Sequence, residues 1–283
     1  MPKAPNSTNA TPSHMLGHVL RPEELLTRTR YRFAEPAEDL RLWVERYWSV
    51  EWSFEEGEEH RTATLDDPAT NLTVERGTFS RRGAASEGVW FTGPGAEERM
   101  DVRLFGSGSV VGIRFRPGAC FEFADDRFRL EADVTHPAEP LFSGAEALLT
   151  VPSNASDAAG VLDDWLLQRG PSDTAEFRQL RAMLATLEAH PLESMESIAA
   201  RIGCSQRTMQ RQFSRLVGVT PKRIRMRARV FRAAALLERG WSDSMADLAA
   251  ALGWFDQAHF ARDFRQVTGT TPAAFAASPT ASR

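Results

Sequence analysis

A repeated pattern near the C-terminus constrains the fold of this chain more than any other feature. The segment SIAARIG at residues 197–203 matches DLAAALG at 247–253, and MQRQFSRLVGVTP at 209–221 matches FARDFRQVTGTTP at 260–272. The offset is 50 residues for the first pair of segments and 51 for the second, so one extra residue lies in the turn between them. A repeat of this kind predicts two copies of one small structural unit.

Each copy predicts two short helices joined by a glycine turn. In the first copy, Gly203 ends one helix and Ser205 is the N-cap of the next. In the second copy, Gly253 and Asp256 stand at the equivalent positions. The apolar residues predicted to face inward from the second helices are Met209, Phe213 and Leu216 in one copy and Phe260, Phe264 and Val267 in the other. The pattern predicts two helix-turn-helix units, which present a helix to the major groove of DNA.

The outward side chains of the predicted second helices are mostly polar. They include Arg207, Gln210 and Arg211 in the first unit and Gln257, His259 and Arg262 in the second. Arginine pairs with guanine, and glutamine with adenine, at about 1 to 3 kcal/mol of base discrimination for each pair. The alternatives are that these are solvated faces of a helical bundle, and that His259 is a structural residue at the start of its helix. Two matched units in one basic segment favour DNA reading.

The segment that contains the repeat is basic, whereas the rest of the chain is acidic. Residues 191–283 contain 14 Lys or Arg and 7 Asp or Glu, a net charge of +7. Residues 1–190 therefore carry -11 of the total charge of -4. A basic segment on an acidic chain is expected when one domain meets a polyanion and the other does not.

A basic helix is predicted between the two units, at residues 221–240. It is about 25 to 30 Å long at 1.5 Å per residue, which suits two readers held about one DNA turn apart. The side chains expected to contact phosphate are Lys222, Arg223 and Arg225 of this helix, with Arg215 and Arg265. Phosphate contacts set register and salt dependence without base preference. Pairing of these cations with the acidic half of the chain is an equal alternative.

The motifs of the two units carry a family resemblance. Residues 199–221 read A-x-x-x-G-x-S-x-R-x-M-x-R-x-F-x-x-x-x-G-x-T-P, and residues 253–272 read G-W-x-D-Q-x-x-F-x-R-x-F-x-x-x-x-G-x-T-P. With these motifs, residues 191–277 resemble the DNA-binding domain of the AraC/XylS family of bacterial transcription regulators. The resemblance implies that one chain places two recognition helices in successive major grooves. It also implies base-reading roles for Arg207, Gln210, Arg211, Gln257, Ala258, His259 and Arg262.

Three residues depart from the family pattern. Ala258 offers no hydrogen bond, so the second recognition helix is expected to read fewer bases. Phe255 stands where a polar residue is common, and Ile224 stands where an aromatic residue is common. These departures concern local packing rather than the fold.

The first 155 residues predict β structure. The segment VERYWSVEWSF at 44–54 alternates between apolar and polar residues, which predicts a half-buried antiparallel strand. Shorter strands are expected at 71–75, 89–93 and 101–105, and GSG at 106–108 predicts a hairpin turn into the next strand. Strands at such short intervals predict a small antiparallel β barrel or jelly roll. The family resemblance implies that this half is a cupin-like sensor domain.

A small barrel can hold a small molecule, and aromatic residues are candidates for its walls. The candidate pocket residues are Trp48, Trp52, Trp90 and Phe115, with Arg114 as the partner of an anion. The alternative is that the aromatic residues belong to an ordinary core and that Arg114 lies on the surface. For each of these five residues taken singly, this alternative is preferred. No H-x-H or H-E-x-x-H spacing occurs, so neither a metal site nor a cofactor is expected. The cysteines Cys120 and Cys204 are expected to be buried free thiols.

Two helical segments are predicted between the halves, at 157–170 and 173–190. The second opens with a capping box formed by Asp173 and Glu176 and carries one apolar stripe. This stripe either packs on the sensor domain or pairs with a second copy. The expected division is a flexible tail at 1–20, a β sensor domain at 21–155, a helical connector at 156–190 and a DNA-binding domain at 191–283.

The sequence thus predicts an α+β protein of several domains that regulates transcription by sequence-specific DNA binding. The expected partners are double-stranded DNA, an unknown small-molecule effector, RNA polymerase if the protein activates, and a second copy in a homodimer. No long apolar run and no secretion signal occur, which favours a cytoplasmic location. One alternative is an enzyme or repair protein with a catalytic first half fused to a DNA-binding tail. Another is a structural DNA-binding protein without an effector.

Overall fold

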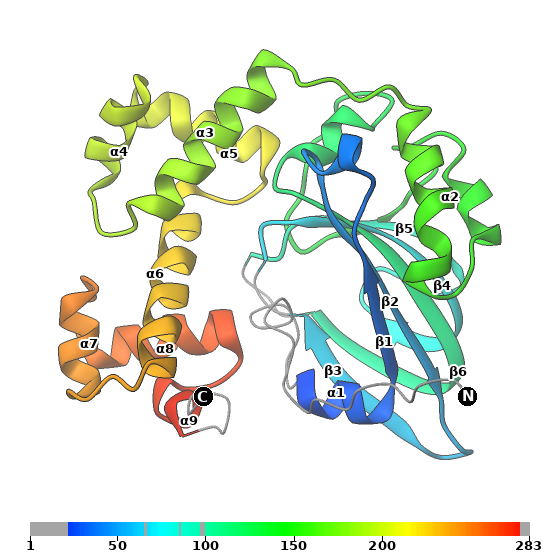
Figure 1. Cartoon of the computed structure of the whole chain (residues 1–283), viewed down its shortest axis with the longest axis horizontal. Coiled ribbons are helices and arrows are strands. Elements are labelled where there is room, and N and C mark those ends of the chain that lie inside the picture. The colour runs from blue at the N-terminus through cyan, green and yellow to red at the C-terminus, as the bar shows by residue number, and fades with distance from the viewer. Residues whose placement is uncertain (1–21, 65–66, 85, 97–99, 278–283) are drawn as a thin grey trace.

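The structure is a computed structural model that describes residues 22–64, 67–84, 86–96 and 100–277. A β-sheet forms the first half, and helices that lie beside it form the second half (Figure 1). The tail predicted at 1–20 lies outside the described residues. None of the described helices is long and apolar enough to cross a membrane.

The first half is built on one antiparallel sheet of seven strands. They are β1 (Arg30–Ala34), β2 (Val44–Ser53), β3 (Glu59–Thr64), β4 (Thr70–Arg81), β5 (Gly88–Thr92), β6 (Met100–Phe115) and β7 (Thr135–Pro137). The strand order is β1-β2-β6-β4-β5-β7, and β3 pairs with the first part of β6. Helix α1 (Pro22–Arg28) precedes the sheet, and the short 3-10 helices η2 (Glu38–Leu40), η3 (Ala119–Glu122) and η4 (Ala145–Thr150) lie in connections.

The prediction of a closed barrel or jelly roll is wrong. Among the described strands, β1 and β7 end the sheet at opposite edges and do not pair with each other. Helix α2 (Ala155–Leu167) lies against β1 and β2 on one face (Figure 1). A helix therefore covers this face of the sheet, whereas in a jelly roll a second sheet would cover it.

The face of β2 that carries Ser49 is buried at Tyr47 and Ser49, half-buried at Glu51 and exposed at Ser53. The prediction of a half-buried strand therefore holds only for the end of this strand. Ser49 has no exposed surface, and its hydroxyl accepts a hydrogen bond from the backbone N–H of Ala155 at 2.9 Å. The hydroxyl of Tyr47 donates to Asp163 on α2 at 2.6 Å. Ser49 was predicted to meet solvent, but it lies at the point where α2 approaches the sheet.

The hairpin turn predicted at residues 106–108 is absent, because β6 runs through this position as one strand. It pairs with β3 in its first part, with β2 in its second part and with β4 along both. A Cβ atom on Gly108 would lie 2.3 Å from Cζ2 of Trp52. Glycine therefore permits the close approach of a tryptophan and does not mark a reversal of the chain.

Helix α3 (Ala175–Ala189) connects the two halves. Its N-cap is Thr174, whose hydroxyl accepts a hydrogen bond from the N–H of Phe177, so the predicted capping box of Asp173 and Glu176 is wrong. The apolar stripe of α3 is buried within the chain and contacts α4, α5 and α6. The two alternatives for this stripe were packing on the sensor domain and pairing with a second copy. The structure supports packing within one copy, and the packing partners are mainly α4, α5 and α6.

The remaining helices form two similar groups joined by a longer helix. They are α4 (Met195–Ile202), α5 (Gln206–Leu216), α6 (Pro221–Glu238), α7 (Met245–Ala251), α8 (Gln257–Thr268) and α9 (Pro272–Ala276). One continuous core of buried residues reaches from Leu40 in the first half to Ile224 in α6. A second core begins at Val230 and includes α7 and α8. The first helical group thus shares a core with the sheet, and the second has its own.

Candidate nucleic-acid interface

The two predicted helix-turn-helix units are confirmed. In the first unit, α4 ends at Gly203 with φ of 76°, and the Ser205 hydroxyl accepts a hydrogen bond from the N–H of Thr208 at 3.1 Å. In the second unit, Gly253 has φ of 75°, and the Asp256 carboxylate accepts from the N–H of His259 at 2.6 Å. The glycines adopt a left-handed conformation that they reach without strain, which allows the tight turn before each second helix.

The inward faces of α5 and α8 are buried as predicted. The six residues Met209, Phe213, Leu216, Phe260, Phe264 and Val267 all belong to the two cores. In the second unit, the rings of Trp254 and Phe260 have centroids 4.8 Å apart, and those of Phe260 and Phe264 are 5.6 Å apart. This packing fixes which face of each helix points outward.

The predicted base-reading residues lie on those outward faces. Arg207, Gln210, Arg211, Gln257, Ala258 and Arg262 are exposed, whereas His259 is half-buried. Nε2 of His259 lies 3.3 Å from the Asp263 carboxylate, which also accepts a hydrogen bond from the indole of Trp254 at 2.8 Å. His259 therefore has a structural partner within the unit as well as partial access to solvent.

The predicted phosphate contacts fall into two groups. Lys222 and Arg265 are exposed on α6 and α8. Arg215 instead forms an ion pair with Glu176 on α3, and Arg225 donates to the backbone carbonyl of Glu193. Arg223 is half-buried. Two of the five side chains thus have partners within the protein, and of these the Arg215 side chain remains 53% exposed.

Two further arginines of α6 make contacts within the protein, and one of them, Arg229, contacts the second unit. The guanidinium of Arg229 lies 3.9 Å from the ring centroid of Trp254 and donates to the carbonyl of Leu252 at 2.7 Å. Arg227 is buried, with its guanidinium 4.8 Å from the ring centroid of Phe231. Cation–π contacts of this kind stabilise helix packing. Part of the high charge of α6 therefore serves structure, through Arg227 and Arg229 near the middle of the helix.

The first half of the chain contains a cavity of about 210 Å³ on the sheet face opposite the main core. Of the predicted pocket residues, Trp48, Trp52 and Arg114 line this cavity. Trp90 and Phe115 do not, which corrects that part of the prediction. The indole of Trp90 donates to the carbonyl of Ser86, and Phe115 is fully buried between Phe123 and Phe142.

The two cysteines have different environments. Burial raises the pKa of the Cys120 thiol to about 12, which keeps it protonated and inert. Cys204 is half-buried, so the prediction of two buried thiols holds only for Cys120. Among the described residues, no group of three or more His, Cys, Asp or Glu side chains is placed to hold a metal ion.

Known protein families match both halves of the chain. Residues 198–278 match the family described as a helix-turn-helix domain. The transcriptional activator RhaS of Escherichia fergusonii is 38% identical over 96 residues, which are 33% of this chain and 34% of RhaS. The C-terminal segment is an AraC-type helix-turn-helix domain. Residues 32–133 match a family described as a domain of unknown function (DUF6597).

The curated relatives named here match about a third of this chain. The regulator YidL of Escherichia coli K12, whose name calls it uncharacterized, is 35% identical over 99 residues, or 34% of this chain and 33% of YidL. The chain therefore spans about a third of the length of these relatives. An AraC-type regulator structure from Chromobacterium violaceum is 27% identical, with a TM-score of 0.33, and the match covers 36% of this chain and 95% of that one.

One exposed residue of the AraC-type domain lies outside the predicted set of DNA-contacting residues. Phe255 is 94% exposed in the turn directly before the N-cap of α8. Its neighbour Trp254 is buried in the second core. The sequence contained one sign of this residue, because Phe255 stands where a polar residue is common in the family. Its exposure shows that this departure does not alter the packing of the second helix-turn-helix unit.

Proposed function

We propose that this protein is a transcription regulator that binds specific DNA sequences through its AraC-type domain. The observation that carries the proposal is the pair of equivalent units, each of which exposes arginine and amide side chains from a recognition helix. Helix α6 has 18 residues and is therefore about 27 Å long. This length is close to the roughly 34 Å of one DNA turn, which favours binding in successive major grooves.

The proposed division of labour follows the order of the chain. Residues 191–283 bind DNA, residues 21–155 form a sensor domain, and residues 156–190 connect them. A relation of the sensor domain to cupin-like domains remains part of this proposal. So do a cytoplasmic location, a homodimer and contact with RNA polymerase. The names of the relatives given above describe transcriptional regulators.

Selection of bound sequences from a random DNA library tests the proposal. The full chain is expected to enrich one motif. Arg211→Ala and Arg262→Ala are each expected to weaken binding to this motif by about 5- to 150-fold, which corresponds to about 1 to 3 kcal/mol, with little effect on scrambled DNA. Lys222→Ala is the matched control, because loss of a phosphate contact weakens binding to both sequences alike and lowers the salt slope by about 1. A chain that enriches no motif would overturn the proposal.

Phe255 extends the proposed interface with an apolar contact. It lies next to the start of α8, where the exposed residues Gln257 and Arg262 follow it on the recognition helix. Apolar side chains at such positions recognise the C5-methyl group of thymine in the major groove. Phe255 would supply base preference at the end of the helix where Ala258 supplies no hydrogen bond.

Replacement of thymine by uracil in the selected motif tests the role of Phe255, because it removes only the methyl group. One position is expected where this replacement weakens binding about fourfold, the value for about 0.8 kcal/mol per buried methyl group. Phe255→Ala should lose about the same amount on thymine DNA and nothing further on uracil DNA. If the two changes are additive at every thymine, Phe255 makes no methyl contact.

Regulation through the sensor domain requires a ligand that binds one state of the protein more tightly than the other. The first core supports such coupling, because it runs from the sheet through α3 into the first helix-turn-helix unit. The test is the affinity for the selected motif with and without a bound small molecule. An unchanged affinity would leave the sensor domain without a regulatory role.

A further inference from the structure

The cavity in the sheet half has walls of two kinds. Strand alternation produces them, since Leu72 and Val74 of β4 face the main core, and Asn71, Thr73 and Glu75 face the cavity. The cavity lies between the sheet and Leu25 of α1. Its volume of about 210 Å³ exceeds the 150 Å³ of an engineered cavity that holds benzene, so it suits one or two fused rings.

Much of the cavity wall is apolar. A buried cluster separate from the main core contributes Leu25, Val50, Trp52 and Leu104 to it. The half-buried residues Tyr31, Trp48, Phe79, Val102 and Val110 complete the wall. Such a surface binds an apolar or aromatic group by removing it from water.

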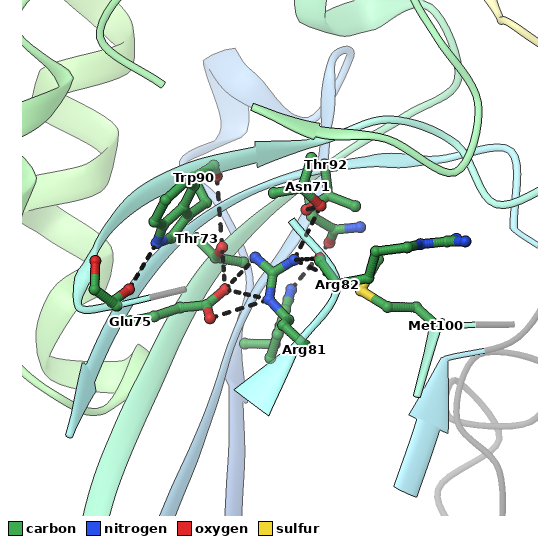
Figure 2. Close-up of polar contacts among 11 residues, drawn as sticks. Asn71, Thr73, Glu75, Arg81, Arg82, Trp90, Thr92 and Met100 are labelled. Atoms are coloured by element: carbon green, nitrogen blue, oxygen red, sulfur yellow. Dashed lines mark hydrogen bonds and ion pairs between the residues drawn. The ribbon is translucent and has the colours of Figure 1, made fainter. Parts of the chain in front are cut away.

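The cavity wall also carries a buried ion pair between Glu75 and Arg81, which are opposite Val110 and Val102 in the sheet. Both side chains are 6% exposed, and Nε of Arg81 lies 3.0 Å from each carboxylate oxygen of Glu75. The hydroxyl of Thr73 donates to the same carboxylate at 2.7 Å, and Nη1 of Arg81 donates to the Thr135 hydroxyl at 3.0 Å. Figure 2 shows Thr73, Glu75 and Arg81 pointing toward one another, with Asn71 and Thr92 nearby.

The other arginines of the cavity wall also have carboxylate partners. Arg114 is paired with Asp67 and, at 2.8 Å, with Glu45, and Arg46 is paired with Glu45. Against the opposing effect of its burial, Asp67 and Glu45 raise the pKa of Arg114. A ligand anion at this wall would have to compete with a carboxylate already in place. A ligand cation would have to compete with a guanidinium.

We propose that this cavity binds a neutral, largely apolar ring compound with one hydroxyl or similar polar group. The ring would lie against Trp48 and Trp52, and the polar group would meet the neutral side chains of Asn71, Thr73 and Thr92. The sequence suggested Arg114 as the partner of an anion, and its internal pairing argues against that ligand class. A role of the compound as an effector rests on the proposed function, whereas its binding does not.

Isothermal titration of the full chain with three matched probes tests the ligand class. The probes 2-naphthalenemethanol, 2-naphthoate and 2-naphthalenemethylamine share one ring system and differ in charge at neutral pH. The alcohol is expected to bind at least tenfold more tightly than either ion, because it leaves the ion pairs of the wall intact. Equal or tighter binding of the carboxylate or the amine would overturn the proposal, and so would the absence of heat with all three.

Two tryptophan substitutions locate the binding site. Val102→Trp fills part of the cavity from its wall and should abolish binding of the alcohol. Val161→Trp is the matched control, because Val161 lies on α2 and is 48% exposed. Ala63→Met, at a second buried position of the wall, provides the same test if Val102→Trp does not fold. Binding that survives in a folded cavity-filling variant would place the site elsewhere and overturn the proposal.

The affinity for the selected DNA motif separates the two proposals. If the alcohol binds and changes this affinity, it acts as an effector. If it binds without changing the affinity, the cavity assignment stands and its regulatory role fails. If the chain selects no motif but binds the alcohol, the regulator proposal fails alone.

Discussion

At the scale of single residues, Arg114 shows which structural features could be predicted from the sequence and which could not. Alternation along its strand placed Arg114 on the face opposite Ile113, as the structure has it. Its partners Asp67 and Glu45 are 47 and 69 residues away in the chain. Partners so distant depend on the pairing of strands, which local patterns do not specify. The residue could therefore be placed on a face, but its burial and pairing could not.

The buried pair of Glu75 and Arg81 leads to a prediction about stability. Glu75→Gln is expected to lower the free energy of unfolding of the sheet half by about 3 to 5 kcal/mol, because it leaves the Arg81 guanidinium buried without its counter-charge. Replacing both residues, as Glu75→Leu with Arg81→Met, should recover most of this loss. Urea unfolding followed by circular dichroism measures each value.

An exposed pair supplies the control for this prediction. Nη2 of Arg28 lies 3.4 Å from Glu58, and both side chains are at least 43% exposed. Glu58→Gln should leave the stability nearly unchanged, because solvent screens exposed ion pairs. Similar losses in Glu58→Gln and Glu75→Gln would show that burial of the cavity pair has no energetic consequence.

At the scale of elements, the helices of the AraC-type domain were predictable and the sheet was only partly so. The caps Ser205 and Asp256 and the spacing of apolar residues are local signals, and each predicted helix of the repeat is present. The sheet depends on long-range pairing and on cover by α2. For that reason the strands near 71–75 and 89–93 were found, but barrel closure and the turn at 106–108 were wrong.

Two glycine substitutions test why β6 was misread as a hairpin. Gly108→Ala is expected to destabilise the sheet by about 1 to 3 kcal/mol, since the added Cβ would lie 2.5 Å from the carbonyl oxygen of Arg76 as well as against Trp52. Gly160→Ala in α2 meets no atom within 4 Å and should instead stabilise by about 0.5 to 1 kcal/mol. Thermal unfolding of both variants measures the difference. A neutral Gly108→Ala would show that close packing does not require glycine there.

At the scale of the whole molecule, the boundary between cores differs from the boundary expected from the sequence. The sequence divided the chain at 190, before the AraC-type domain, whereas the first core continues to Ile224 within α6. Contacts across the expected boundary are close, since a Cβ on Gly218 would lie 2.9 Å from Cγ of Pro94. Glu176 on α3 pairs with both Arg127 and Arg215. The first helix-turn-helix unit is therefore joined to the sheet.

This arrangement predicts that the second unit opens independently of the rest of the chain. Phe264→Ala and Phe213→Ala remove the same fully buried side chain from equivalent helices and should each cost about 3 to 5 kcal/mol. In hydrogen exchange followed by mass spectrometry, Phe264→Ala is expected to speed exchange in α7 and α8 alone. Phe213→Ala should speed exchange in α5 and also in α3 and the sheet, because they share one core. Faster exchange of the sheet in Phe264→Ala would show that the two cores unfold as one. A ligand in the sheet would then act on both recognition helices equally, whereas separate cores direct its effect first to α5.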